Sequence, residues 1–115
     1  MANFNQVILI GNLTRQPALS YLPNQTPVTE FGLAVNRRWR REDGSQADEV
    51  CYVECQAFGK RAEVISKHLG KGSPIFVRGR LKFEQWQKDD QTHSRLRVVV
   101  EDFEFIGPKR EADTE

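Results

Sequence analysis

The segment Pro74–Trp86, with the sequence PIFVRGRLKFEQW, shows the two-residue alternation of a β-strand with two different faces. One face carries apolar residues and a glycine, namely Val77, Gly79, Leu81 and Phe83. The other face carries cations and aromatic rings with one carboxylate, namely Phe76, Arg78, Arg80, Lys82, Glu84 and Trp86. An apolar core accepts the first face, whereas burying unpaired cations would be costly. The segment therefore predicts a strand whose apolar face lies in the core and whose cationic face is available to a ligand.

Four further segments outside this strand are also predicted to be strands. They are Val7–Thr14, Thr29–Trp39, Glu49–Phe58 and Arg95–Ile106. In the first, Gly11 and Asn12 interrupt an apolar run, which indicates a bend or bulge. In the last, the apolar alternation changes phase between Val100 and Phe103, which predicts a bulge near Glu101.

One helix is predicted, over Arg61–Leu69, where Ala62, Val64, Ile65 and Leu69 form a short apolar stripe and Gly70 favours a C-terminal stop. Polar loops are expected at 42–48 and 88–93. Five strands with one short helix between the third and the fourth is the element order of the OB-fold, an all-β Greek-key barrel. Its binding face lies on the second and third strands and on the neighbouring loops.

Length and composition limit the function. A chain of 115 residues is expected to form one domain, and its 17 basic and 16 acidic residues nearly cancel, so the position of the charges matters more than their sum. No apolar run approaches the roughly 20 residues that cross a bilayer, and no signal peptide is recognised, so we expect a cytoplasmic protein without a membrane partner. Cys51 and Cys55 are expected to be reduced packing residues. Residues 108–115 are expected to form a frayed, charged end.

The segment Val35–Glu42, VNRRWRRE, places one tryptophan, Trp39, among the four arginines Arg37, Arg38, Arg40 and Arg41. Strict alternation would turn Trp39 toward the core, so we expect the strand to end or to twist outward before it. Tyr52 and Phe58 share one face of the third predicted strand. Rings interleaved with cations suit a polyanion with flat groups, which is single-stranded nucleic acid, and sequence-tolerant binding is expected.

Structural alternatives remain open for each of these features from the residues alone. The arginine-rich segment suits a solvated turn, with the indole packed on its own barrel. Tyr52 or Phe58 suits the core or a subunit interface, and Trp86 suits the rim of the barrel. Arg78, Arg80 and Lys82 also suit the protection of an edge strand against aggregation.

Enzymatic functions are weakly supported by the sequence. Cys51 and Cys55 with His68 and His93 do not form a convincing zinc site, because same-parity cysteines in an apolar strand are more often core residues. Gly70–Ser73 lacks the upstream glycine and the following helix of a phosphate-binding loop, and Asp89 and Asp90 suit a solvated turn. We therefore expect no metal, no cofactor and no catalysis. The remaining alternatives are an OB-fold that binds folded RNA or proteins, and a metal-dependent nucleic-acid enzyme.

Three motifs together carry a resemblance to a known family. VILIGNL (Val7–Leu13) is followed by a proline, FGKRAE (Phe58–Glu63) enters the predicted helix, and KGSPIFVRGRL (Lys71–Leu81) precedes a tryptophan. Over nearly the whole chain, the sequence resembles the bacterial single-stranded DNA-binding proteins. The resemblance implies base stacking on Trp39, Tyr52, Phe58 and Trp86, with Tyr52 where a tryptophan is common. It further implies a homotetramer around which DNA wraps, and roles in DNA replication, recombination and repair.

The expected DNA-binding residues are Trp39, Tyr52, Phe58, Trp86, Arg37, Arg38, Arg40, Arg41, Lys60, Arg78, Arg80 and Lys82. The loops after Arg41 and after Gln87 are expected to be flexible and to close over the strand. Members of the family usually continue through a flexible linker into an acidic tip that recruits replication and repair enzymes. This sequence stops at ADTE (112–115), so residues 1–107 are expected to be the DNA-binding domain without that recruiting tip.

Overall fold

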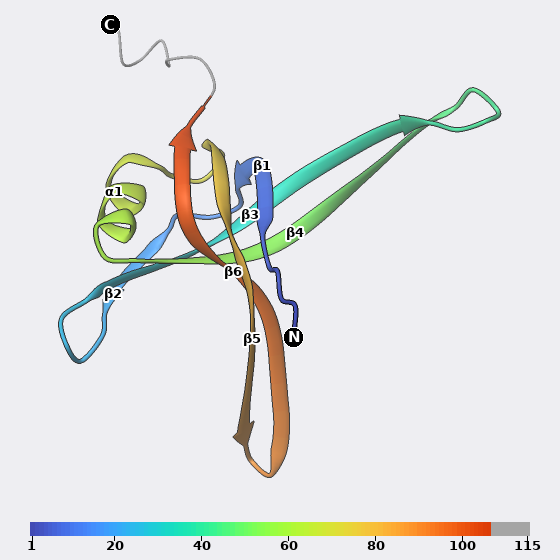
Figure 1. Ribbon diagram of the computed structural model, residues 1–115. Helices are drawn as coiled ribbons and strands as arrows, with labels where there is room; N and C mark the ends of the chain where they lie inside the picture. Colours follow the sequence, from blue (N-terminus) through green and yellow to red (C-terminus); the bar gives the residue numbers. More distant parts are fainter. Residues whose placement is uncertain (107–115) are drawn as a thin grey trace, which may run out of the picture.

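The computed structural model describes residues 1–106, so the end predicted to fray at 108–115 lies outside the described residues. The described elements are β1 (Val7–Leu13), β2 (Ala18–Tyr21), β3 (Pro27–Arg40), β4 (Gln46–Phe58), α1 (Lys60–His68), β5 (Pro74–Lys88) and β6 (Gln91–Phe105). Five of the strands close a barrel in the order β1-β5-β6-β4-β3, and β3 returns to β1 (Figure 1). The predicted all-β OB-fold barrel is confirmed, with its helix between β4 and β5.

One strand was not predicted. The short β2 pairs antiparallel with the start of β3, so that Ala18 lies opposite Glu30 and Tyr21 lies opposite Pro27. All four residues of β2 are exposed. A half-buried strand is recognised from apolar residues that alternate with polar ones, because one of its sides faces the core. No side of β2 is buried, so its sequence does not show this alternation.

Both predicted irregularities of the barrel strands are confirmed. At the bend of β1, Asn12 pairs with Pro74 of β5 and also with Ala34 of β3, which lets β1 close the barrel. In β6, the register with β5 shifts at Glu101, because Arg78 lies opposite Asp102 whereas Gly79 lies opposite Val100. Beside this bulge, a Cβ atom on Gly79 would lie 2.0 Å from the carbonyl oxygen of Val99, so the close approach of the two strands requires a glycine.

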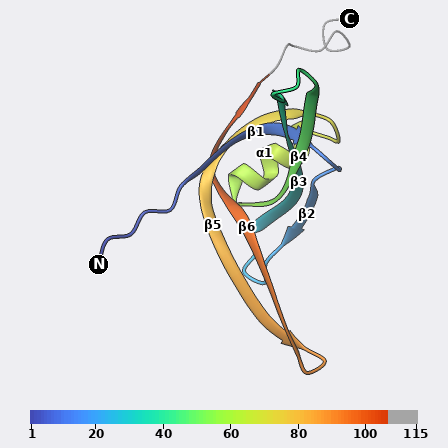
Figure 2. The same cartoon turned by 90° about the vertical axis from the view of Figure 1, so that its right-hand side faces the viewer.

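The core of the barrel is built from alternate residues of the strands and from one face of the helix. Its buried members are Leu13, Phe31, Leu33, Cys55, Ala57, Ile65, Ile75, Val77, Val98 and Val100. Burial of each large apolar side chain stabilises the fold by about 1.5–3 kcal/mol. The helix contributes Ile65, and Figure 2 shows α1 surrounded by strands, so that it closes one end of the barrel.

Two long hairpins extend from the barrel in different directions (Figure 1). We call residues 36–50 the β3–β4 arm and residues 80–97 the β5–β6 arm; their strands pair as far as Arg40 with Gln46 and Lys88 with Gln91. The arms raise the radius of gyration to 16.9 Å, compared with the value of about 13 Å for a compact domain of about 100 residues.

The arms contradict three expectations from the sequence. The predicted loops at 42–48 and 88–93 are shorter than expected, because 46–48 belong to β4 and only Asp89 and Asp90, which both have positive φ, separate β5 from β6. Leu81 and Phe83, predicted to face the core, are exposed because β5 has left the barrel after Gly79.

The two cysteines have different environments. Cys55 is buried in the core as predicted, and burial raises the pKa of its thiol to about 12. Cys51 is exposed, so the expectation that it is a packing residue is wrong. It lies where β4 enters the barrel from the β3–β4 arm, beyond the reach of the core. Within residues 1–106, no helix has the length and apolar character needed to cross a bilayer.

Candidate nucleic-acid interface

The outward side of β4 presents the aromatic face that the alternation predicts. Tyr52, Glu54, Gln56 and Phe58 share one side of the strand, and Tyr52 is 74% exposed. Phe58 is half-buried at the end of β4 and lies opposite the buried Val28 of β3. Six residues of strand separate the two rings by about 20 Å. Tyr52 is therefore freely available to a ligand, and Phe58 only in part.

Trp86 lies near the tip of the β5–β6 arm and is 41% exposed. It pairs with His93 across the hairpin, and the two rings are stacked, with centroids 5.7 Å apart and planes inclined by 21°. The guanidinium carbon of Arg95 lies 5.3 Å from the indole centroid. These neighbours support the indole in a stacked arrangement that a nucleobase could extend.

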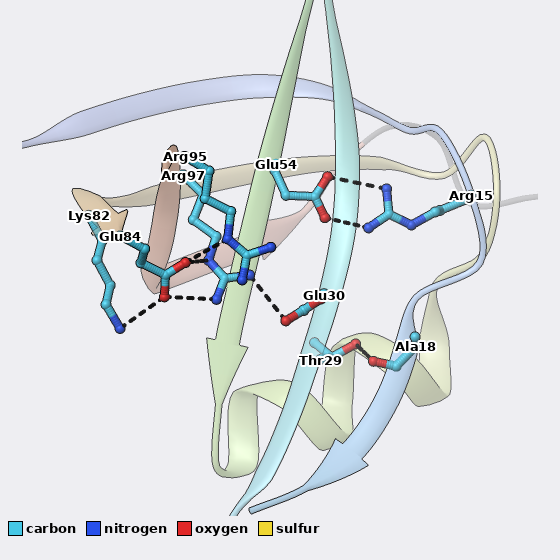
Figure 3. Close-up of polar contacts among 9 residues, drawn as sticks. All are labelled: Arg15, Ala18, Thr29, Glu30, Glu54, Lys82, Glu84, Arg95 and Arg97. Carbon is cyan, nitrogen blue, oxygen red and sulfur yellow. Dashed lines mark hydrogen bonds and ion pairs between the residues drawn. The ribbon is translucent and has the colours of Figure 1, made fainter. Parts of the chain in front are cut away.

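An ion-pair network lies on this side of the β5–β6 arm, where the arm meets the barrel (Figure 3). Arg97 is 3% exposed and donates to Glu30 of β3 at 3.1 Å and to Glu84 of β5 at 3.0 Å. Arg95 donates to Glu84 at 2.7 Å, and Nζ of Lys82 lies 3.5 Å from the same carboxylate. The hydrogen bonds from Arg95 and Arg97 lower the pKa of Glu84 to about 2. Because Arg97 holds Glu30 and Glu84 together, the network fastens the arm to β3.

A second ion pair, Arg15–Glu54, crosses β3 (Figure 3), and Tyr52 lies two residues before Glu54 on β4. Arg15, on the segment after β1, donates its two terminal nitrogens to the two carboxylate oxygens of Glu54, one of them over 3.3 Å. A Cβ atom on Gly32 would lie 2.8 Å from Nη1 of Arg15, so this glycine makes room for the guanidinium. The hydrogen bond to Glu54 raises the pKa of Arg15. The pair borders a hollow of about 220 Å³ that is lined by Thr14, Arg15, Gly32, Leu33, Tyr52, Val53 and Glu54.

The cations predicted on β5 all have acidic neighbours. Arg78 lies 3.9 Å from Glu101 and 3.8 Å from Asp102, and Arg80 lies 3.0 Å from Glu101. Arg78 pairs with Ile8 of β1 on its other side, so it belongs to the outer surface of the β1–β5 pair and not to β4. Lys82 belongs to the network around Glu84, which brings it to the arm face that carries Trp86.

The β3–β4 arm carries Trp39, but not on the side of Tyr52. The expectation that β3 ends before Trp39 is wrong, because pairing continues to Arg40 and places Trp39 opposite Ala47. Alternation therefore puts Trp39 with Arg37, whose guanidinium carbon lies 4.5 Å from the indole centroid. Ala47 is buried although it lies on an arm, which indicates that the facing indole covers it.

The arginines of this arm differ in their partners. Arg37 pairs with Glu49 at 3.2 Å, and Arg38 pairs with Asp48 at 2.9 Å. Arg40 donates to the carbonyl oxygen of Gly44, and Arg41 donates to the hydroxyl of Ser45. Neither hydrogen bond pairs the guanidinium with a carboxylate.

Lys60 lies apart from the aromatic face. It begins α1 and lines a shallow hollow with Glu63, Val64, Lys67 and His68 of the same helix. Among residues 1–106, no three His, Cys, Asp or Glu side chains are grouped so that they could hold a metal ion.

Five residues that the sequence analysis did not single out as functional belong to this face: Arg15, Glu30, Glu54, Arg95 and Arg97. Arg95 and Arg97 alternate with Leu96 and Val98, so their shared side could have been noticed from the sequence. Their pairing with Glu84 depends on the register between β5 and β6, which is set by the two-residue turn that joins these strands. Arg15 and Glu54 are 39 residues apart and have no local signal that links them.

Comparisons with known proteins agree with this architecture. Residues 4–106 match the model of the family described as the single-strand binding protein family. A protein of Wolinella succinogenes, described as a single-stranded DNA-binding protein, is 43% identical over 107 residues, which are 92% of this chain and 66% of that protein. The chain thus spans slightly less than two thirds of the length of this relative.

Solved structures share the fold. The wild-type single-stranded DNA binding protein from Thermus aquaticus superposes with a TM-score of 0.79 and 34% identity, over 90% of this chain and 50% of that chain. An SSB of Plasmodium falciparum, solved in a complex with single-stranded DNA, superposes with a TM-score of 0.83 over 93% of this chain and 98% of that chain, and its 23% identity supports the fold alone. Since the family model covers nearly all of the described residues, the chain belongs to the single-strand binding protein family.

Proposed function

We propose that the chain binds single-stranded DNA with little overall sequence preference, by stacking bases on exposed rings and pairing cations with phosphates. The observation that carries this proposal is the continuous face on which the exposed ring of Tyr52 is joined to Trp86 by a row of arginine–carboxylate pairs. Stacking of an unpaired base on an aromatic ring contributes about 1–3 kcal/mol. A duplex hides the faces of its bases, so this surface suits a single strand.

In this proposal the strand runs along the face between the two arms. Tyr52 and Trp86 are the principal stacking positions because both rings are exposed. Phe58 and Trp39 are secondary positions because both are half-buried, and Trp39 is reached only where the strand passes around the β3–β4 arm to its other side. The phosphates are held by cations of the arms and of the barrel, namely Arg37, Arg38, Arg40, Arg41, Lys60, Arg78, Arg80 and Lys82.

The acidic partners of these cations affect the salt dependence of binding. Each phosphate that contacts Arg37, Arg38 or Lys82 has to replace a carboxylate that is already there. Such a cation binds few counterions in the free protein, so fewer counterions are released than the number of cations suggests. We therefore expect a salt dependence weaker than that of a surface with unpaired arginines.

We also propose that copies of the chain assemble into a homotetramer. Two apolar strips are exposed on different surfaces: Ile8 and Ile10 on β1, and Leu81, Phe83 and Leu96 on one side of the β5–β6 arm. Soluble monomers rarely expose such strips, and a tetramer with dihedral symmetry needs more than one kind of contact. Sedimentation of Ile8→Asp and Phe83→Asp should each give a smaller species than the unmodified protein, and unchanged tetramers or a monomeric parent protein would contradict this proposal.

We propose binding alone, with no bond broken, and a cytoplasmic role in protecting single strands during replication, recombination and repair. The support is the family to which the chain belongs and the names that its relatives carry.

The proposal is tested by the affinity for poly-dT of the unmodified protein, Tyr52→Ala and Tyr52→Phe. We expect Tyr52→Ala to weaken binding by about 1–3 kcal/mol, because it removes a stacking ring, and Tyr52→Phe to retain most of the affinity. Tyr21→Ala is the matched control, because Tyr21 is an exposed tyrosine on β2, which is separated from β4 by β3 and pairs with the end of β3 remote from Tyr52. Equal affinity for poly-dT and for a duplex would contradict the proposal, as would an unchanged affinity of Tyr52→Ala.

A further inference from the structure

The hollow beside Tyr52 is unusual because an ion pair and an exposed ring border the same space. The guanidinium of Arg15 and the carboxylate of Glu54 face each other across Gly32, and Tyr52 lies two residues before Glu54 on the same side of β4 (Figure 3). The volume of about 220 Å³ has room for a single nucleobase and not for a second one stacked on it. A base that stacks on Tyr52 would thus have its edge next to Arg15 and Glu54.

The two side chains supply complementary groups next to each other. Arg15 offers only donors and Glu54 only acceptors, and the bidentate pair holds them side by side. Their side chains are 46% and 35% exposed, so a ligand can reach the polar atoms of both. An exposed ion pair contributes little to stability, so opening it for a ligand costs little.

We propose that this hollow is a guanine subsite. Along its edge, guanine presents the acceptors N7 and O6, followed by the donors N1–H and the N2 amino group. Arg15 then donates to N7 and O6, and Glu54 accepts from N1–H and the N2 amino group, while the ring stacks on Tyr52. Adenine and thymine instead alternate acceptor, donor and acceptor, which places a like group against Arg15 or Glu54. Cytosine can match the donors of Arg15 and the acceptors of Glu54 with three of its groups, so we expect its affinity to be second to that of guanine.

This inference rests on the proposed binding of single-stranded DNA and adds one selective position to an otherwise tolerant strand. The other exposed ring of the face, Trp86, also has an ion pair beside it, Arg95–Glu84, but that pair is less available to a base. Arg95 lies over the indole, and Glu84 is only 20% exposed and also pairs with Lys82 and Arg97. Selectivity is therefore expected at a single base.

The test uses dT oligonucleotides of about eight nucleotides, a length within the site size of one OB-fold. One dT is replaced, at each position in turn, by dG, dA, deoxyinosine or 7-deaza-dG, and the dissociation constant is measured. At one position we expect dG to bind about fivefold or more tightly than dA, which controls for stacking of a purine. Deoxyinosine lacks the N2 amino group and 7-deaza-dG lacks N7, so each should lose part of this gain.

Two variants test whether the Arg15–Glu54 pair causes the preference for guanine. Glu54→Gln keeps the size of the side chain but removes one acceptor, and Arg15→Lys keeps the charge but removes the planar fork. Both should abolish the preference for dG over dA, whereas Glu63→Gln and Arg61→Lys, on the exposed side of α1, should preserve it. Binding of all oligonucleotides without a preference for guanine, or a preference that survives in both Glu54→Gln and Arg15→Lys, would overturn this inference alone. Failure to bind any single strand would overturn the proposed function and this inference with it.

Discussion

The two arms of the molecule have the same construction but different attachments. Both are hairpins with a tryptophan near the tip, Trp39 and Trp86. The β5–β6 arm is tied to the rest of the chain three times. Arg97 pairs with Glu30, Arg80 donates to Glu101 at 3.0 Å, and the Asn5 side chain, before β1, both donates to and accepts from the backbone of Leu81, at 2.8 and 2.9 Å. In the part of the chain that the structure describes, side chains of the β3–β4 arm make hydrogen bonds only within the arm.

The arms also differ in the position of unpaired charge. In the β5–β6 arm three cations near the barrel, Lys82, Arg95 and Arg97, surround the single carboxylate of Glu84, so each of them has an acidic partner. In the β3–β4 arm Arg37 and Arg38 form cross-strand ion pairs, whereas Arg40 and Arg41 at the tip bond to a carbonyl and a hydroxyl and are followed in sequence by Glu42 and Asp43. We therefore expect a division of roles: the attached β5–β6 arm holds a ring for stacking, and Arg40 and Arg41 of the β3–β4 arm, which have no ion pair to open, contact phosphates.

The largest effect is expected from Arg97→Met, which removes the attachment of the β5–β6 arm. Arg97 is buried between two carboxylates, and removal of one partner from a buried pair costs about 3–5 kcal/mol of the free energy of unfolding. We expect a loss at the lower end of this range, because Glu84 retains Arg95. Urea denaturation measures it.

Arg38→Met is the matched control on the other arm. Its pair with Asp48 is exposed, so the expected loss is below about 1 kcal/mol. Equal losses for the two variants would contradict the difference in attachment between the arms.

The next effect concerns the two tryptophans and DNA affinity. Trp86→Ala and Trp39→Ala should each weaken binding to poly-dT by about 1–3 kcal/mol, because each removes a stacking ring. Trp86→Phe and Trp39→Phe are the controls that keep an aromatic face. Unchanged affinity of both alanine variants would refute stacking on the arms, and a loss for Trp86→Ala alone would restrict the role of the β3–β4 arm to charge.

A smaller effect is expected in the salt dependence. Arg41→Gln should reduce the slope of log K against log salt by about 0.7, because one phosphate contact with a single strand is lost. Arg78→Gln should reduce it less, because Glu101 and Asp102 already flank that guanidinium. Dissociation constants at a series of salt concentrations distinguish the two. A larger reduction for Arg78→Gln would contradict the expectation that an arginine without an ion pair, such as Arg41, binds phosphate more readily.

The smallest effect is the pH dependence of stability contributed by Glu84. Its pKa is lowered from 4.5 to about 2 in the folded chain, so its contribution is present above pH 4.5 and is lost as the pH falls toward 2. The difference in the free energy of unfolding between the unmodified protein and Glu84→Gln should therefore shrink over this interval. A difference that stays constant between these pH values would contradict the role of the carboxylate. Asp48→Asn, in the exposed pair of the other arm, is the control.

Local alternation predicts the barrel strands, the helix and the bulge at Glu101, because these features depend on neighbours within a few residues. It does not predict where a strand leaves the barrel. Leu81 and Phe83 continue the apolar side of β5, yet they lie on the arm, since the end of the core is set by the other strands. The same limit explains the error at Trp39, where cross-strand pairing carries β3 past its expected end.

The candidate site divides in a similar way. Tyr52 on β4 and Trp86 on β5 are each predicted to face a ligand from the alternation within their own strand, and both are exposed in the structure. The pairs that surround them join residues distant in sequence: Arg97 and Glu30 are 67 residues apart. No local pattern reports such a contact, and only the closure of the barrel brings the partners together.

The most direct test of the account is the fluorescence of each tryptophan during titration with poly-dT, with a duplex control, at low and high salt. Trp39→Phe leaves Trp86 as the single indole, and Trp86→Phe leaves Trp39. We expect strong quenching of Trp86 by the single strand and not by the duplex, weakened by salt. Unchanged emission of Trp86 while a mobility assay shows that the strand is bound would contradict the claim that the face joining Tyr52 to the β5–β6 arm is the binding surface.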